Sequence, residues 1–268
     1  MALFLSYEDK GTYTSRVPLV LVHGHPFDRT MWAPQIETFS RGRRVIAPDL
    51  RGYGSSPVVP GITPLPLFAR DIEELLDGLK VDTFVLGGLS MGGQIAMACV
   101  DLLGDRVRGL LLADTSAAPE TEEGRRGRAA MADRLLREGL DGYADEVLEK
   151  MVAPYADPGV KAHVHRMMTA TDPQGAAAAL LGRAERPDYR PLLTRVAVPA
   201  LVVVGADDEY TPVADAEALH SALPDSVLRV VEGAAHLPNL ERPAEFDRAL
   251  AGLLERVDGQ ESGSTGRP

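Results

Sequence analysis

Residues 88–92, Gly-Leu-Ser-Met-Gly, combine a hydroxyl group with two glycines in the spacing G-x-S-x-G. They lie between an apolar run at residues 84–86 and a stretch with helical periodicity. A sharp turn from strand to helix holds such a serine in a strained conformation, and the glycines remove side chains that would collide across the turn. The five residues alone would also fit a plain glycine-rich connection. In this context they predict that Ser90 is a nucleophile.

A serine hydroxyl is a weak nucleophile at neutral pH and needs an adjacent base. His236 follows the last predicted strand, in the segment Gly-Ala-Ala-His-Leu-Pro, where a loop can present an imidazole at the carboxyl edge of a parallel sheet. His163, His165 and His220 lie within helical patterns that carry no neighbouring catalytic signal. His236 is therefore the predicted general base.

The base needs an acid to orient it, and three aspartates compete for that role. Asp207 and Asp208 both follow the predicted strand at residues 201–204, and Asp114 ends another strand. Neighbouring side chains on an extended segment point in opposite directions, so only one of the adjacent pair can reach His236. Spacing alone does not choose between Asp207 and Asp208, and Asp114 ranks below both.

A tetrahedral oxyanion requires donors that are already aimed at it. The backbone N–H of Met91, the residue after the nucleophile, is one predicted donor, and the N–H of His25 is the other. His25 belongs to the segment His-Gly-His-Pro after the predicted strand at residues 17–22, where Gly24 allows a close approach of the backbone. The side chain of His25 either lines the pocket or is a loop residue without a chemical role.

Short apolar runs that end in Gly, Asp or Ser alternate with helical periods along most of the chain. Such runs are typical of buried parallel strands. Alternation of strand and helix predicts an α/β fold with a mostly parallel central sheet flanked by helices. The predicted strands are residues 17–22, 44–47, 84–86, 110–113, 201–204 and 227–231.

The alternation stops for about 75 residues, where helical periods occur without a convincing strand. We therefore expect a core over residues 1–116, an inserted helical cap over 117–190, and the rest of the core over 191–257. Met131, Met151, Met167 and Met168 would form either an apolar pocket wall or the interior of the cap. The Gly- and Ser-rich segment 258–268 is expected to be disordered.

The chain has 28 Lys and Arg against 39 Asp and Glu, a net charge of −11. This balance argues against binding to nucleic acid or to an anionic membrane. The sequence offers no long apolar run and no secretory signal, and its single cysteine and scattered histidines suggest neither a disulfide nor a metal site. We expect a cytoplasmic protein that needs no metal or organic cofactor, and the oligomeric state is left open.

Together the motifs resemble the α/β-hydrolase superfamily over nearly the whole chain. They are HGHP (23–26), DLRGYGSS (49–56), GLSMGG (88–93), GADDEYTP (205–212) and GAAHLPNLERPAEF (233–246). The acid loop of that family commonly reads G-x-x-D-x-x-x-P, and the resemblance therefore implies that Asp208 is the acid. It also implies an oxyanion N–H from His25 and the order Ser, Asp, His along the chain.

Residues 137–156 and 169–188, with the ending HLPNLERPAEF, are similar to the 3-oxoadipate enol-lactonase branch and its bacterial esterase relatives. The resemblance implies hydrolysis of a small ester or lactone. The sequence departs from that branch in the HGHPFD loop and at residues 174–177, where an aromatic residue would be expected after the glycine.

Other chemistries could use the same three side chains. They include a cofactor-free perhydrolase, a C–C bond hydrolase, and a tailoring lactonase or cyclase of a biosynthetic pathway. A serine at position 90, in place of an aspartate, argues against haloalkane dehalogenase and epoxide hydrolase chemistry. A different class of function would be a ligand-binding receptor or signalling protein on the same scaffold.

Overall fold

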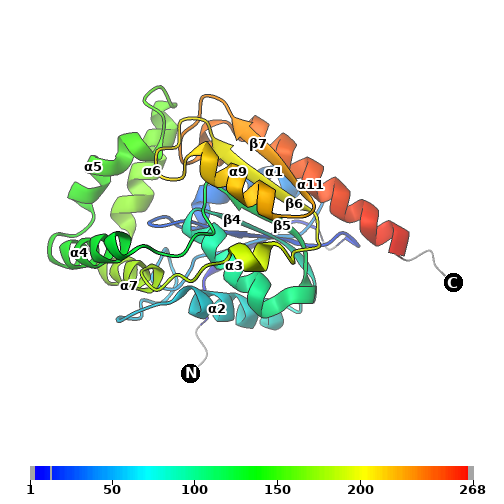
Figure 1. Cartoon of the computed structure of the whole chain (residues 1–268), viewed down its shortest axis with the longest axis horizontal. Helices are drawn as coiled ribbons and strands as arrows, with labels where there is room; N and C mark the ends of the chain where they lie inside the picture. Colours follow the sequence, from blue (N-terminus) through cyan, green and yellow to red (C-terminus); the bar gives the residue numbers. More distant parts are fainter. Residues whose placement is uncertain (1–3, 13, 265–268) are drawn as a thin grey trace.

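A seven-stranded sheet forms the centre of the structure, a computed structural model that describes residues 4–12 and 14–264. The strand order is β1-β3-β2-β4-β5-β6-β7, and only β1 runs antiparallel to its neighbour (Figure 1). The predicted mostly parallel α/β architecture is confirmed. The strands are β1 (Tyr7–Lys10), β2 (Leu19–Val22), β3 (Val45–Pro48), β4 (Phe84–Leu89), β5 (Val107–Ala113), β6 (Ala200–Gly205) and β7 (Ser226–Val231).

The sequence prediction missed β1, although it located the other six strands. β1 has the sequence Tyr-Glu-Asp-Lys and is mostly exposed, so it lacks the apolar run that marks a buried strand. Its pairing with β3, from Tyr7 opposite Pro48 to Lys10 opposite Val45, holds it at the sheet edge. Backbone pairing with a strand far along the chain therefore decides this element.

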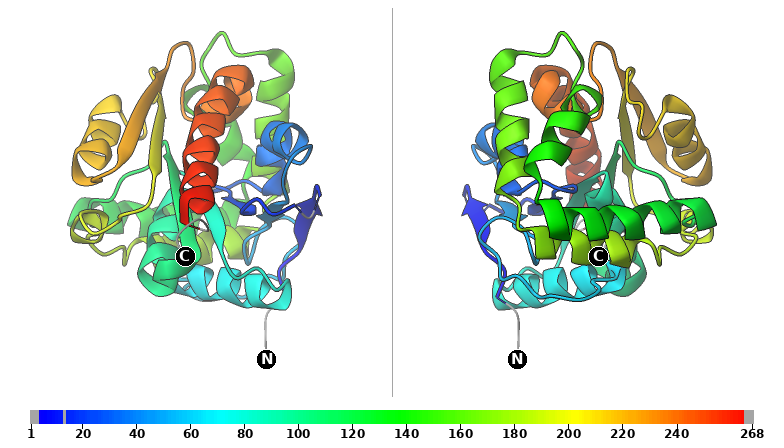
Figure 2. Two further views of the ribbon diagram at one scale, coloured as in Figure 1. Left: turned by 90° about the vertical axis from the view of Figure 1, so that its right-hand side faces the viewer. Right: turned by 90° about the vertical axis from the view of Figure 1, so that its left-hand side faces the viewer.

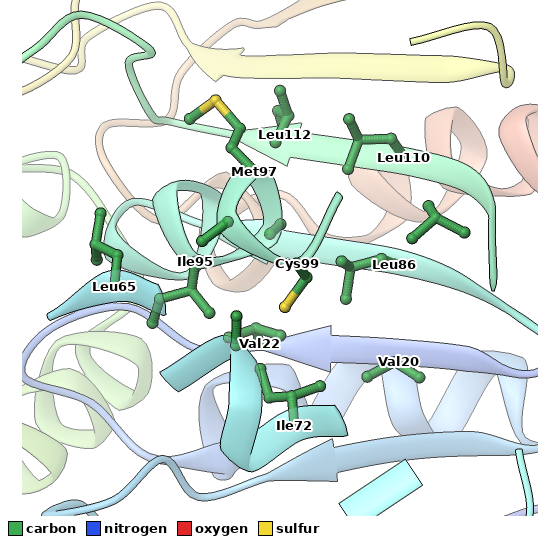
Figure 3. Packing of buried hydrophobic residues seen from close by; sticks show 14 of the residues in the cluster. Val20, Val22, Leu65, Ile72, Leu86, Ile95, Met97, Cys99, Leu110 and Leu112 are labelled. Carbon is green, nitrogen blue, oxygen red and sulfur yellow. The ribbon is translucent and has the colours of Figure 1, made fainter. Parts of the chain in front are cut away.

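Helices cover both faces of the sheet. One face carries α2 (Leu65–Gly78), α3 (Met91–Leu103), α8 (Arg190–Leu193) and α9 (Val213–Ala222), and the other carries α1 (Ala33–Phe39), α10 (Pro238–Glu241) and α11 (Pro243–Ser264). Figure 3 shows side chains of β2, β4 and β5 packed against Ile95 and Cys99 of α3 and Ile72 of α2. Because helices cover both faces of the sheet, the sequences of the buried strands are continuous apolar runs.

Four helices lie between β5 and β6, within the segment where an insertion was expected. They are α4 (Glu122–Glu138), α5 (Asp141–Met151), α6 (Pro158–Ala170) and α7 (Pro173–Arg183). In Figure 2 these green helices lie in front of the core in the right-hand view and behind it in the left-hand view, so they occupy one side of the molecule. α4 and α7 share a small apolar cluster of their own, whereas α5 and α6 join the cluster on the α11 face of the sheet.

The helix α7 approaches the loop after β3 closely at two glycines. A Cβ atom on Gly175 would lie 2.0 Å from the carbonyl oxygen of Gly52, and one on Gly52 would lie 2.6 Å from the Cα atom of Gly175. Gly52 also has a φ of +80°, which side chains rarely adopt. Contact between the two backbones thus requires glycine at both positions.

We expect Gly175→Ala to destabilise the protein by about 1–3 kcal/mol, because the methyl group would push α7 away from the loop. Gly252→Ala in α11 is the matched control, since a Cβ atom there has no neighbour within 4 Å. That change should stabilise the protein by about 0.5–1 kcal/mol, because alanine favours a helix interior. Urea unfolding measures the change in the free energy of unfolding for both variants. Equal changes at the two positions would contradict the prediction.

The expectation of a disordered tail from residue 258 onward is wrong for residues 258–264, because α11 runs through to Ser264. The Asp258 carboxylate lies 2.9 Å from Arg43 and 3.7 Å from Arg16, which ties this part of the helix to the core. A helix that is already docked by its apolar face extends at little cost for each added residue. Residues 265–268 lie outside the described residues.

Candidate active site

Ser90 lies in the sharp turn between β4 and α3. Its φ of 57° and ψ of −117° place a non-glycine residue in a strained region, which costs on the order of 1–3 kcal/mol. A Cβ atom on Gly88 would lie 2.1 Å from the carbonyl oxygen of Gly92, and one on Gly92 would lie 2.1 Å from that of Val22. Side chains at the two glycines of the motif would therefore prevent the turn.

Thr115 holds the turn from the segment after β5, which sequence reasoning did not connect with it. Its hydroxyl donates a hydrogen bond of 2.7 Å to the carbonyl oxygen of Ser90, which also accepts from the N–H groups of Gly93 and Gln94. A Cβ atom on Gly93 would lie 2.6 Å from the Thr115 side chain. A threonine two residues after a strand carries no distinctive sequence signal, so only the fold reveals this role.

The loop that contains His25 lies directly against the turn. A Cβ atom on Gly24 would lie 3.1 Å from the carbonyl oxygen of Leu89 and 3.2 Å from Cβ of Ser90. Within the described part of the chain, the backbone N–H groups of Met91 and His25 donate to no protein acceptor. Two N–H groups without an acceptor on segments that meet beside Ser90 are suited to receive an oxyanion.

His236 is buried and faces Asp208. The imidazole Nδ1 lies 2.8 Å from Oδ2 of Asp208, whose Oδ1 accepts from the N–H groups of Tyr210 and Thr211 at 2.8 and 3.2 Å. Burial raises the pKa of Asp208, but the charge of His236 and these hydrogen bonds outweigh it, so the pKa falls below its usual value. Asp208 is thus an ionised group bonded to the imidazole.

The structure brings Asp208, and not Asp207, to His236. Asp207 is exposed, and its carboxylate accepts a hydrogen bond from the hydroxyl of Tyr155, between α5 and α6. The two adjacent side chains therefore have different partners, as expected for neighbours on an extended segment.

Asp114 is buried next to Asp208, with one oxygen accepting from the N–H of Gly205 at 2.8 Å. Burial and the nearby charge of Asp208 raise the pKa of Asp114 well above its usual value. Asp114, Asp208 and His236 are the group of possible metal ligands that the described residues bring within 4.8 Å of one another. Within this group, the Asp208 carboxylate bonds directly to the His236 imidazole and orients it.

We expect Asp114→Asn to become more stable relative to wild type as the pH rises from 5 to 8. A carboxyl group whose pKa is raised by folding contributes stability that is present at low pH and is lost as the pH rises toward the folded pKa. Asparagine does not titrate, so the variant does not lose stability in this way as the pH rises. Urea unfolding at several pH values checks the trend, and a stability difference that stays constant with pH would contradict it.

Ser90 and His236 line one pocket of ≈ 520 Å³, a size typical of small-molecule sites. In the described residues no hydrogen bond joins the Ser90 hydroxyl to the imidazole. Such bonds are often long in an unliganded enzyme and shorten when the substrate binds. The pocket thus places the Ser90 hydroxyl, the His236 imidazole and His25 around one space.

The insertion helices supply much of the remaining pocket wall. Of the methionines considered from the sequence, Met131 and Met151 line the pocket. Met151, Met167 and Met168 are buried within the cluster on the α11 face. The wall also carries three arginines that sequence reasoning missed, Arg128, Arg183 and Arg186. They are separated along the chain and match no motif, so only the packing of α4 and α7 brings them together.

The side chain of His25 also lines the pocket, and its Nδ1 lies 2.8 Å from the hydroxyl of Tyr53. Burial, with the charges of Arg183 and Arg128, lowers the pKa of His25 well below its usual value. The imidazole is therefore neutral at pH 7. His23, in contrast, bonds to the backbone of Gly24 and Leu50 and holds the loop.

None of the helices over the described residues has the length and apolar character needed to cross a membrane.

Comparison with known proteins gives a consistent family. Residues 19–249 match the model of the alpha/beta hydrolase family. An esterase from Thermogutta terrifontis, solved with malate bound, is 40% identical with a TM-score of 0.91 over 94% of this chain and 93% of its own. 3-oxoadipate enol-lactonase 2 of Acinetobacter baylyi is 30% identical over 85% of each chain. A pimeloyl-[acyl-carrier protein] methyl ester esterase of Chromobacterium violaceum is 32% identical over 88% of this chain and 94% of its own.

Proposed function

This chain belongs to the α/β-hydrolase family, and on that premise we propose that it is a serine hydrolase of small carboxylic esters or lactones. The observation that carries the proposal is the bond of 2.8 Å between His236 and Asp208 in a pocket that also contains Ser90. A base held by an ionised acid beside a strained serine is the arrangement that nucleophilic acyl transfer requires. Esterases and lactonases among the relatives support the same reaction class.

In the proposed reaction the Ser90 oxygen attacks the substrate carbonyl while His236 takes its proton. Asp208 stabilises the resulting imidazolium, and the N–H groups of Met91 and His25 receive the oxyanion. The C–O bond then breaks, and His236 returns the proton to the departing alcohol oxygen. A water molecule attacks the acyl enzyme by the same proton route and releases the acid and free Ser90.

Residues 117–190 would act as a cap in this scheme. Helices α4, α5 and α7 supply pocket residues such as Arg128, Val147 and Leu180, so the insertion would set which acyl and alcohol groups fit. The reaction uses this chain's own side chains and needs no organic cofactor.

A fluorophosphonate probe and p-nitrophenyl acetate test the proposal together. We expect the probe to modify Ser90, located by peptide mass spectrometry, and the ester to be hydrolysed over many turnovers. Labelling of Ser90 with no turnover across a panel of esters and lactones would favour a ligand-binding protein on this scaffold. Turnover that continues after Ser90 is fully labelled would assign the hydrolysis to another group and end the proposal.

A further inference from the structure

Arg183 places a guanidinium in the wall of the pocket that also contains Ser90. It is the last residue of α7, and its Nε donates a hydrogen bond of 3.2 Å to Oε1 of Gln94. The backbone N–H of Gln94 in turn donates to the carbonyl oxygen of Ser90. One residue thus links the guanidinium to the turn that carries the nucleophile, and a small substrate could contact both groups.

The charges around Arg183 are not balanced locally. Arg128 and Arg186 share the carboxylate of Glu120, and Asp215 also lines the pocket and raises the pKa of Arg186. Among the residues described by the structure, no carboxylate lies within ion-pairing distance of Arg183. Of the three guanidiniums in this wall, Arg183 is therefore the one that lacks an anionic partner.

The groups nearest to Arg183 do not supply a negative charge. Burial raises the pKa of Tyr53 and Tyr143, so both hydroxyls stay protonated, and His25 is neutral. Burial, with the charges of Arg128 and Arg186, lowers the pKa of Arg183 to about 9, which still leaves it charged at pH 7. A partly desolvated cation without a counter-charge favours an anionic ligand.

We propose that Arg183 binds a carboxylate of the substrate, so that the enzyme acts on a half-ester of a small dicarboxylic acid or on a lactone that carries a carboxylate. The planar guanidinium can form two parallel hydrogen bonds to a carboxylate, which would fix the direction in which the ester enters. This inference rests on the proposed reaction at Ser90. With the carboxylate at Arg183 and the ester carbonyl at Ser90, the apolar part of the pocket would receive only the carbon chain between these two groups.

Matched pairs of substrates test the inference. p-Nitrophenyl hydrogen glutarate and p-nitrophenyl pentanoate have acyl chains of equal length and differ in the terminal carboxylate. Acetoxyacetate and ethyl acetate place the same difference in the alcohol part, which distinguishes the two possible positions of the anion. We expect wild type to have a higher kcat/KM for the anionic member of at least one pair. Equal values within both pairs, or a preference for the neutral esters, would overturn the inference without any variant.

Arg183→Gln should lower the ratio of anionic to neutral kcat/KM roughly tenfold to one-hundredfold, because a charge-assisted hydrogen bond is lost. Arg183→Lys keeps the positive charge but cannot form two parallel hydrogen bonds to a carboxylate. Its ratio of anionic to neutral kcat/KM should therefore lie between those of wild type and Arg183→Gln. Arg137→Gln removes the same charge from an exposed site on α4 outside the pocket lining, and it should leave the ratio unchanged.

Binding of glutarate separates this inference from the proposed reaction. Ser90→Ala should bind glutarate in a calorimetric titration, and the double variant Ser90→Ala with Arg183→Gln should bind it at least tenfold more weakly. If the ratio and the affinity are unchanged in Arg183→Gln while the neutral ester is still hydrolysed, the carboxylate site is wrong and the hydrolase stands. If Ser90 neither labels nor turns over any ester but glutarate binding still depends on Arg183, the reaction is wrong and the carboxylate site stands.

Discussion

Ser90→Ala is expected to lower kcat/KM for an ester substrate roughly ten-thousandfold to a millionfold, because the acyl enzyme can no longer form. The remaining rate would come from water that is held beside His236 and the N–H groups of the turn. Alanine keeps the Cβ atom and the strained backbone of Ser90, so stability should stay within about 0.5 kcal/mol of wild type. Hydrolysis of p-nitrophenyl acetate and urea unfolding measure the two quantities.

Ser116→Ala is the matched control for this change. Ser116 lines the same pocket and has a hydroxyl, but it follows β5 and does not occupy the strained turn. Its replacement should alter kcat/KM by less than about tenfold. Comparable losses in the two variants would show that pocket shape, and not a nucleophile at position 90, supports the reaction.

Asp208→Asn is expected to lower kcat about ten-thousandfold, because an amide cannot stabilise the imidazolium and favours the wrong tautomer of His236. The bond of 2.8 Å to His236 joins the ionised carboxylate to the proposed base, and asparagine keeps the shape of aspartate but not its charge. Binding of the substrate should change much less than the chemical step. Single-turnover kinetics separate the two effects.

The same substitution at Asp114 provides a strong contrast. Asp114 is buried beside Asp208, but burial and the charge of Asp208 raise its pKa and favour its protonated form, whereas the pKa of Asp208 is lowered. Asp114→Asn should therefore retain kcat within about tenfold of wild type. A loss at Asp114 as large as that at Asp208 would mean that the two carboxyl groups act as one unit and that the division of roles between them is wrong.

Local sequence determined the parts of this protein that depend on neighbours along the chain. Residues 88–92 specify the turn because each glycine removes a Cβ atom that would overlap backbone. Apolar runs specified six strands because both faces of the sheet are covered, and the loops that carry His236 and Asp208 follow directly from strand ends. Choosing Asp208 over Asp207 needed family resemblance, since both residues fit the spacing.

Tertiary structure alone decided the features that depend on contacts between distant segments. The edge strand β1 exists because β3 offers it backbone partners, and Thr115 reaches the carbonyl oxygen of Ser90 because β4 and β5 are neighbours. Arg183 faces the pocket because α7 packs on α4 and on the loop at Gly52. A sequence pattern records which residues are adjacent or periodic, whereas the charge of a pocket depends on which distant residues the packing brings together.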